Sequence, residues 1–135
     1  MKLKDYSNAN VVVNMGTNDV SPNLDQGANA PTYYAPKYAT LHKQLISEYP
    51  NIKLVVVSVT PFDEGEGGAV TYKLTADLPD KFNNKMKAEI SGTNIVYCDV
   101  NSKVKSKFGS DFTYDGIHHH ANIDKYIYEE IRNCL

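Results

Sequence analysis

Three short runs of consecutive apolar residues mark the chain. They cover Val11–Met15, where Asn14 is the one polar position, Leu54–Val59, and Ile95–Cys98. Apolar runs of this length are typical of strands that are buried on both faces, as in a parallel sheet covered by helices. We therefore expect about three parallel strands in these segments.

The segments around these runs have helical spacing, with apolar residues three or four positions apart. Together the two patterns predict strand, helix, strand, helix, strand, loop and helix, which is an α/β fold of three layers, α/β/α, with right-handed crossovers. Long loops are expected over Val20–Pro36 and Pro61–Ala76. The residues with helical spacing are Tyr38, Leu41, Leu45 and Tyr49 before Pro50, then Leu78, Phe82, Met86 and Ile90 before Gly92, and finally Ile123, Tyr126, Ile127, Ile131 and Cys134.

The length and the charges narrow the class of protein. The chain has 135 residues, which predicts one domain over 1–135. Its 14 basic and 16 acidic residues form no run, so binding to nucleic acid or to an anionic membrane is not expected. No membrane-spanning segment or signal peptide is expected either. The compartment stays open: cytoplasmic, or secreted if the natural N-terminus lies upstream.

Two cysteines, Cys98 and Cys134, form at most one disulfide. A single pair does not make a disulfide scaffold, and we favour two reduced thiols.

Polar residues that are able to take part in catalysis follow the expected strands. Ligands of an open parallel sheet bind at the carboxyl ends of its strands. Asp115 lies three residues before His118 in Tyr-Asp-Gly-Ile-His. A carboxylate at this spacing can accept the Nδ1 proton, which leaves Nε2 free as a general base. The alternative is an ordinary Asp-Gly turn.

A second group follows the first strand, in Gly16-Thr17-Asn18-Asp19. The N–H of Gly16 and the side-chain amide of Asn18 could converge as hydrogen-bond donors to an oxyanion. A glycine turn followed by helix-capping residues is the alternative.

Taken together, the two blocks resemble the SGNH (GDSL-type) hydrolase family, over most of the chain. This resemblance implies an ester hydrolase with a partial flavodoxin-like fold. It implies that Gly16 and Asn18 donate to the oxyanion, that His118 is the base, and that Asp115 orients it. No metal or other cofactor is implied.

The chain departs from the family at the nucleophile. Members carry a strand that ends in Gly-Asp-Ser, and their five strands are ordered 2-1-3-4-5. This chain contains no Gly-Asp-Ser and only the last three expected strands. Ser21 and Ser110 are the candidate substitutes at the correct edge, but neither belongs to a strand–turn–helix elbow. We expect the nucleophile to lie outside this chain.

The run His118-His119-His120 could indicate a metal site. Consecutive residues that enter a helix point about 100° apart, so three of them do not converge on one ion. No metal is therefore expected.

Tyr33 and Tyr34 lie in the first expected long loop, where they could contact substrate or simply pack. Tyrosines near a cleft suit sugar rings, and the segment Val11–Pro61 is similar to carbohydrate esterases of the family. An O-acetyl sugar ester is the substrate that we favour.

Three interpretations remain open. The chain is part of an ester hydrolase, a non-catalytic remnant that binds carbohydrate or protein, or an α/β interaction module. In each, the strand Val11–Met15 lacks its family neighbour, so we expect self-association or a complementary N-terminal fragment to cover it.

Overall fold

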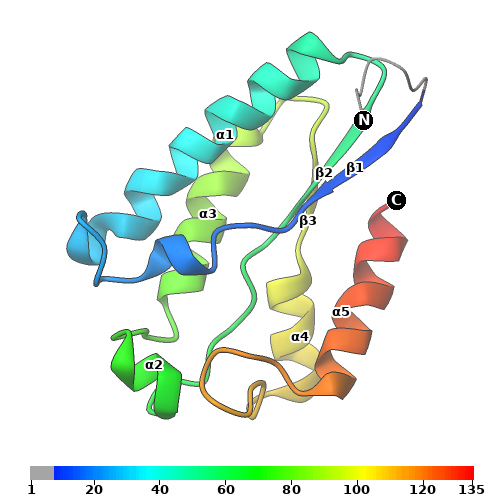
Figure 1. The fold of residues 1–135 in the computed structure, drawn as a ribbon. Helices are drawn as coiled ribbons and strands as arrows, with labels where there is room; N and C mark the ends of the chain where they lie inside the picture. The colour runs from blue at the N-terminus through cyan, green and yellow to red at the C-terminus, as the bar shows by residue number, and fades with distance from the viewer. Residues whose placement is uncertain (1–7) are drawn as a thin grey trace.

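The structure is a computed structural model that describes residues 8–135 (Figure 1). Short strands alternate with helices along the chain, as the sequence predicts. The elements are β1 Asn10–Val13, the 3₁₀ turns η2 Asn18–Val20 and η3 Gly27–Asn29, α1 Ala30–Glu48, β2 Lys53–Val57, α2 Gly67–Thr71, α3 Leu78–Ile90, β3 Val96–Cys98, α4 Val100–Phe108 and α5 Ala121–Cys134.

The three strands form one parallel sheet in the order β1-β2-β3. Val12 of β1 is in register with Val55 of β2, and Val56 of β2 is in register with Tyr97 of β3. The expected parallel sheet of about three strands is therefore confirmed.

Helices cover both faces of the sheet (Figure 1). Successive side chains of β2 point to opposite faces because a strand has a period of two. Leu54 and Val56 pack in the cluster that includes residues of α1 and α3. Val55 and Val57 pack in the other cluster, with residues of α4 and α5. The expected α/β/α layering is confirmed.

The predicted helices at 78–90 and 123–134 are present. The helix predicted from Tyr38 to Tyr49 is also present, but it begins earlier than expected. Helix α1 starts at Ala30, so much of the expected loop Val20–Pro36 is helical. Pro31 lies in the first turn, where a helix needs no N–H donor, and Pro36 lies inside the helix.

Two helices were not expected from the sequence. Helix α2 lies inside the second predicted loop, and α4 follows β3 directly. The start of α4 has a clear cap, because the carboxylate of Asp99 accepts a hydrogen bond from the N–H of Ser102 at 3.1 Å.

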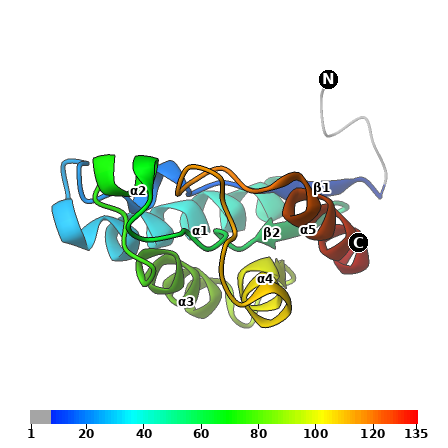
Figure 2. The same cartoon turned by 90° about the horizontal axis from the view of Figure 1, so that it is seen from below.

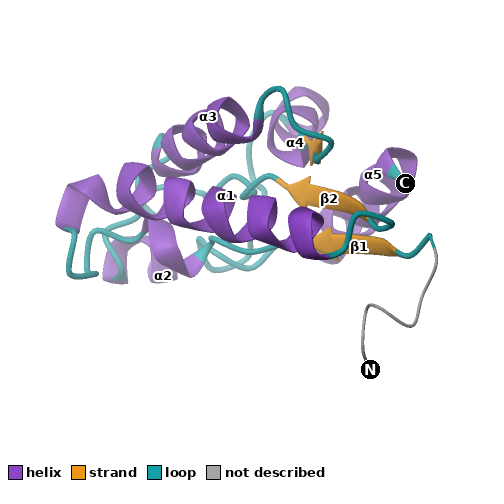
Figure 3. Cartoon of the chain, turned by 90° about the horizontal axis from the view of Figure 1, so that it is seen from above, coloured by secondary structure: helices purple, strands orange, loops and turns teal. Residues whose placement is uncertain are grey.

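Strand β1 is shorter than predicted and lies at an edge of the sheet (Figure 3). Its apolar run suggested a strand buried on both faces. Instead Val12 is 40% exposed, and the following Met15 is 55% exposed. Within residues 8–135, no strand pairs with the outer side of β1.

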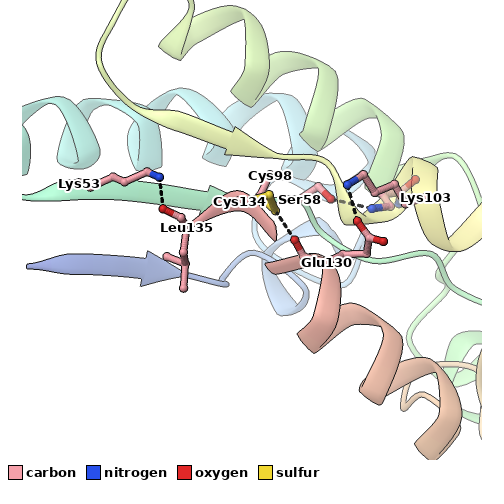
Figure 4. Close-up of a disulfide and its surroundings, with 8 residues drawn as sticks. Lys53, Ser58, Cys98, Lys103, Glu130, Cys134 and Leu135 are labelled. Carbon is pink, nitrogen blue, oxygen red and sulfur yellow. Dashed lines mark hydrogen bonds and ion pairs between the residues drawn. A yellow bond between two sulfur atoms is a disulfide. The ribbon is translucent and has the colours of Figure 1, made fainter. Parts of the chain in front are cut away.

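Cys98 and Cys134 form a disulfide, so the expectation of two reduced thiols is wrong. Figure 4 shows how the last turn of α5 meets the end of β3, which brings the two Cα atoms to 5.9 Å. This separation lies within the usual range for a disulfide. The proximity depends on how α5 packs, which the spacing of the cysteines in the sequence does not reveal.

Buried asparagines fix the chain where it leaves β2. The side chain of Asn83 accepts from the N–H of Val59 and donates to its carbonyl, both at 2.8 Å. Asn101 donates to the same carbonyl at 2.8 Å. These side-chain bonds take the place of backbone hydrogen bonds between strands beyond the end of β2. They hold Thr60 at the carboxyl end of the strand.

In the described part of the chain, no helix combines the length and the apolar character that crossing a bilayer requires.

Candidate active site

Asp115 and His118 lie in the loop between α4 and α5, which Figure 2 shows in orange. Oδ2 of Asp115 is 2.7 Å from Nδ1 of His118, so the expected contact between the two side chains is confirmed. Oδ1 of Asp115 accepts from the N–H groups of Ile117 at 3.0 Å and His118 at 2.7 Å. The carboxylate therefore holds both the turn and the imidazole.

These hydrogen bonds keep Asp115 ionised. The backbone N–H of His118, then the His118 ring, and then the N–H of Ile117 lower the pKa of Asp115 to about 2. A carboxylate that stays charged at neutral pH accepts the Nδ1 proton of His118 and leaves Nε2 without one.

The His118 ring is open to solvent, with 67% of the side chain exposed. It lies beside the Tyr114 ring, with the centroids 5.9 Å apart and the planes 21° apart. Asp115 is its one hydrogen-bond partner within residues 8–135. Nε2 is thus free to take a proton from an incoming group.

Helix α2 supports this loop from the other side. The N–H of Gly68 donates to the Asp115 carbonyl at 2.7 Å. Gly116 has a φ of +91°, and a Cβ on it would lie 2.8 Å from the Glu66 carbonyl oxygen. Such a close approach requires glycine. The loop therefore sits against α2 in one arrangement.

Gly16 and Asn18 follow β1 at the same edge of the sheet. Gly16 has a φ of +114°, and an added Cβ would lie 2.8 Å from the Phe82 ring. Its carbonyl accepts from the N–H of Asp19 at 3.0 Å, which forms the turn. Gly16 is therefore needed for packing, whatever else its N–H does.

Both proposed donors lack hydrogen-bond partners among residues 8–135: the N–H of Gly16 and the amide of Asn18. Asn18 is exposed and shares two cavities with His118. Gly16 lies two residues before it and lines neither cavity, so the orientation of its N–H toward substrate stays a prediction.

His118 lies between these two cavities, of about 420 and 520 Å³. Thr17, Asn18, Ile117 and His118 line both. The smaller, which we call the β1 cavity, is also lined by Asn14, Thr60, Tyr114, His119, Asp124 and Ile127. The larger, the α2 cavity, is also lined by Ser21, Asn23, Leu24, Tyr72 and Leu74.

No serine hydroxyl within residues 8–135 is hydrogen-bonded to His118. The hydroxyl of Ser21 donates to the Tyr72 carbonyl at 3.1 Å, and that of Ser58 is buried and accepts from the N–H of Asn101 at 2.8 Å. Ser110 is exposed, outside both cavities. Ser7 lies outside the described residues. Neither candidate substitute, Ser21 or Ser110, is arranged as an activated nucleophile.

The three consecutive histidines turn to three different carboxylates. His118 contacts Asp115, Nδ1 of His119 is 3.4 Å from Asp124, and Nε2 of His120 is 3.4 Å from Asp111. The three rings thus have separate partners.

Tyr33 and Tyr34 are in the first turns of α1, not in a loop, and line neither cavity. The hydroxyl of Tyr34 instead bonds Asp25 at 2.5 Å. The structure therefore does not bring Tyr33 and Tyr34 to His118.

The sequence reasoning missed other residues of the site. Thr17 and Ile117 lie inside the two motifs, so their positions were available from the sequence. Tyr72 was not, because α2 reaches the site only through tertiary packing.

Comparisons with known proteins address the family and the fold of the chain. The family model for GDSL-like lipase/acylhydrolase matches residues 2–131. A comparison with curated proteins gives no match.

Solved structures share the fold. A proposed acylhydrolase from Bacteroides fragilis is 22% identical, with a TM-score of 0.70, and the match covers 93% of this chain and 60% of that one. A GDSL-like lipase from Bacteroides thetaiotaomicron is 23% identical, with a TM-score of 0.66 and coverage of 93% and 60%. An aryl esterase from M. smegmatis is 20% identical, with a TM-score of 0.66 and coverage of 94% and 61%.

This chain thus spans about 60% of the length of those solved structures. Part of their flavodoxin-like α/β arrangement is present here. The family model matches nearly the whole chain, and the chain belongs to the GDSL-like lipase/acylhydrolase family.

Proposed function

We propose that this chain carries the base and the oxyanion donors of a carboxylic ester hydrolase, and that a serine outside these 135 residues is the nucleophile. The observation that carries the proposal is the 2.7 Å contact between Asp115 and His118, with Nε2 free beside the cavities that Asn18 also lines.

In the first step, Nε2 of His118 takes the proton of the serine hydroxyl as the serine oxygen bonds to the ester carbonyl carbon. The carbonyl oxygen becomes an oxyanion, which the N–H of Gly16 and the amide of Asn18 stabilise. Asp115 stabilises the imidazolium. The C–O bond to the alcohol then breaks, and His118 gives its proton to the departing alkoxide. Water then attacks the acyl-serine carbonyl while His118 takes its proton, the bond to the serine oxygen breaks, and His118 returns the proton to the serine as the acid leaves.

The β1 cavity is the side from which we expect the serine to arrive. It lies between the end of β1 and α5, next to the edge of β1 that no described strand occupies. A complementary segment that pairs with Val11–Met15 would bring its carboxyl end to this cavity. An open reading frame that continues upstream of Met1 into a strand ending in Gly-Asp-Ser would identify the source of the serine.

The experiment that tests the proposal supplies a nucleophile from solution. The full chain is mixed with p-nitrophenyl acetate and methanol, and methyl acetate is measured. We expect transfer about 100-fold faster than in His118→Ala, at the lower end of general-base catalysis. Asn18→Ala should lower the transfer rate roughly tenfold. This is less than usual for the loss of an oxyanion donor, because Gly16 remains.

His120→Gln is the matched control, because His120 shares the loop and contacts Asp111 instead. Its rate should equal that of the unmodified chain. Equal rates for the unmodified chain and His118→Ala would contradict the proposal and favour a non-catalytic module that binds carbohydrate or protein. The preference for O-acetyl sugar esters stays a prediction.

A further inference from the structure

The Tyr114 ring lies beside His118 although it is largely in solvent. Tyr114 is 68% exposed, more than any other large hydrophobic residue within residues 8–135. Its ring centroid is 5.9 Å from that of His118, with the planes 21° apart, and 6.3 Å from that of His120. Centroids at these distances are typical of interacting aromatic pairs. A ring that buries so little surface adds little to the free energy of folding, so stability alone does not account for its position.

Hydrogen bonds of the loop hold residue 114 in place without its ring. The N–H of Tyr114 donates to the His118 carbonyl at 3.0 Å. The neighbouring Thr113 donates its N–H and its hydroxyl to the Asp63 carboxylate, at 2.6 and 2.7 Å. The Thr113 hydroxyl also accepts from the N–H of Gly116 at 3.0 Å. None of these bonds uses the Tyr114 side chain, so the ring can be replaced while the loop keeps its arrangement.

The imidazole of His118 needs more than its hydrogen bond to stay in one orientation. The contact between Nδ1 and Oδ2 of Asp115, at 2.7 Å, holds one corner of the ring. Rotation of the exposed ring about its Cβ–Cγ bond breaks this single contact and swings Nε2 away. A general base has to lie within about 3 Å of the group whose proton it takes. A displacement of about 1 Å is enough to cost roughly 100-fold in rate.

Tyr114 bounds the imidazole on the side of the β1 cavity. Tyr114 and His118 both line that cavity, whereas only His118 of the two lines the α2 cavity. The two rings are nearly parallel. A tilt of the imidazole would open this stacked contact at one edge and compress it at the other. The Tyr114 face therefore resists the rotation that the hydrogen bond to Asp115 leaves possible.

We infer that Tyr114 is a positioning residue of this site, and that its stacked ring holds the plane of the His118 imidazole. The inference rests on the proposed function for the reaction, in which Nε2 of His118 takes the proton of the nucleophile. Asp115 fixes the tautomer and one atom of the ring, and Tyr114 fixes the direction of the ring. The aromatic face does this work, since the Tyr114 hydroxyl makes no hydrogen bond within residues 8–135.

The mobility of the His118 ring tests the inference without any reaction. In the full chain, ¹³C relaxation of the ring carbon Cδ2 gives an order parameter, which falls as the ring becomes more mobile. We expect an ordered ring in the unmodified chain and in Tyr114→Phe, and a lower order parameter in Tyr114→Ala. Tyr128→Ala is the control, because Tyr128 is 63% exposed but lies on α5 and lines neither cavity. It should leave the order parameter of His118 unchanged.

The transfer from p-nitrophenyl acetate to methanol provides the second measurement. We expect Tyr114→Ala to lower kcat about fivefold, in keeping with the usual strength of aromatic pairs. KM should stay the same, because a residue that acts through His118 does not bind the substrate. Tyr114→Phe keeps the aromatic face and should retain the full rate. A residue that contacted the substrate would instead raise KM and leave kcat unchanged.

The two measurements separate the inference from the proposed function. An unchanged order parameter of His118 in Tyr114→Ala, equal losses in Tyr114→Phe and Tyr114→Ala, or a change in KM alone would overturn the inference. His118-dependent transfer at the same rate in Tyr114→Ala would overturn it too, and would keep the proposed function. A mobile His118 ring in Tyr114→Ala, in a chain whose transfer does not depend on His118, would remove the proposed reaction and leave Tyr114 as the residue that orients the imidazole.

Discussion

The two edges of the sheet differ in how they are held. On the β3 side, the Cys98–Cys134 disulfide joins the strand to α5, and Lys103 pairs with Glu130 (Figure 4). On the β1 side, the described residues provide no neighbouring strand, and Val12 and Met15 are exposed. Neither outer strand has a further neighbour within residues 8–135, but a disulfide ties β3 to α5, whereas none reaches β1.

The candidate active site lies at the carboxyl ends of the strands and combines residues from the β1 side and the β3 side of the sheet. Asp115 and His118 lie inside the segment that the disulfide closes, whereas Gly16 and Asn18 follow the open strand. The proposed base is therefore supported within this chain, and the proposed oxyanion donors follow the strand whose outer side has no described neighbour. Under the proposed function, this difference accounts for an aligned histidine to which no described serine hydroxyl is bonded.

Removing the disulfide on the β3 side should have the largest effect on the free energy of unfolding. The disulfide joins residues 36 apart, and the chain-entropy model gives about 4 kcal/mol for a loop of this size. We expect Cys98→Ser to lower the free energy of unfolding in urea by about this amount. Reduced wild-type protein should match the variant. Equal stability of the oxidised and reduced wild type would contradict the account.

Gly16→Ala tests the turn that carries the proposed oxyanion donors. An added Cβ would meet the Phe82 ring at 2.8 Å, in a backbone conformation with φ of +114°. We expect the free energy of unfolding, measured by heat or urea, to fall by about 2 kcal/mol. Gly27→Ala is the control, because its φ is +53° and nothing lies within 4 Å of the added Cβ. The two variants should therefore differ. An equal loss in both would show that the Phe82 contact is not tight.

Val12→Lys tests the open edge. Val12 is exposed, so the free energy of unfolding should change by less than about 0.5 kcal/mol. Association is expected to change instead, since a lysine on an edge strand discourages pairing. Light scattering should show that the unmodified chain associates as its concentration rises and that Val12→Lys does so less.

Leu41→Lys is the matched control for this edge, because Leu41 is also exposed but lies on α1. It should associate like the unmodified chain. A monomer at all concentrations, or the same change in Leu41→Lys, would show that β1 does not mediate association.

The smallest expected effect is the titration of Asp115. Its pKa is lowered from 3.8 to about 2, so its contribution to stability is present above pH 3.8 and is lost as the pH falls through about 2. The ¹³C signal of its carboxyl group should titrate near pH 2. In His118→Ala the midpoint should rise only partly, because the N–H groups of residues 117 and 118 remain. A midpoint near 3.8 in the unmodified chain would show that these bonds do not form in solution.

The strands could be predicted because their apolar runs are local signals. Asp115 and His118 could also be paired, since three residues across one turn determine their distance. The start of α1 could not be predicted, because a proline such as Pro31 indicates a loop unless it is known to lie in the first turn of a helix. The disulfide and Tyr72 depend on packing between distant segments. Helix α4 did have a signal that was passed over, in Asp99 followed by Val100, Val104 and Phe108 at a spacing of four.

The central claim is that Asp115 aligns His118 as a base with a bare Nε2. The ring ¹⁵N shifts of neutral His118, assigned with His118→Gln, measure this directly. The account predicts a proton on Nδ1 and none on Nε2 in the unmodified chain, and a return toward the Nε2–H form in Asp115→Ala. A proton on Nε2 in the unmodified chain would contradict it.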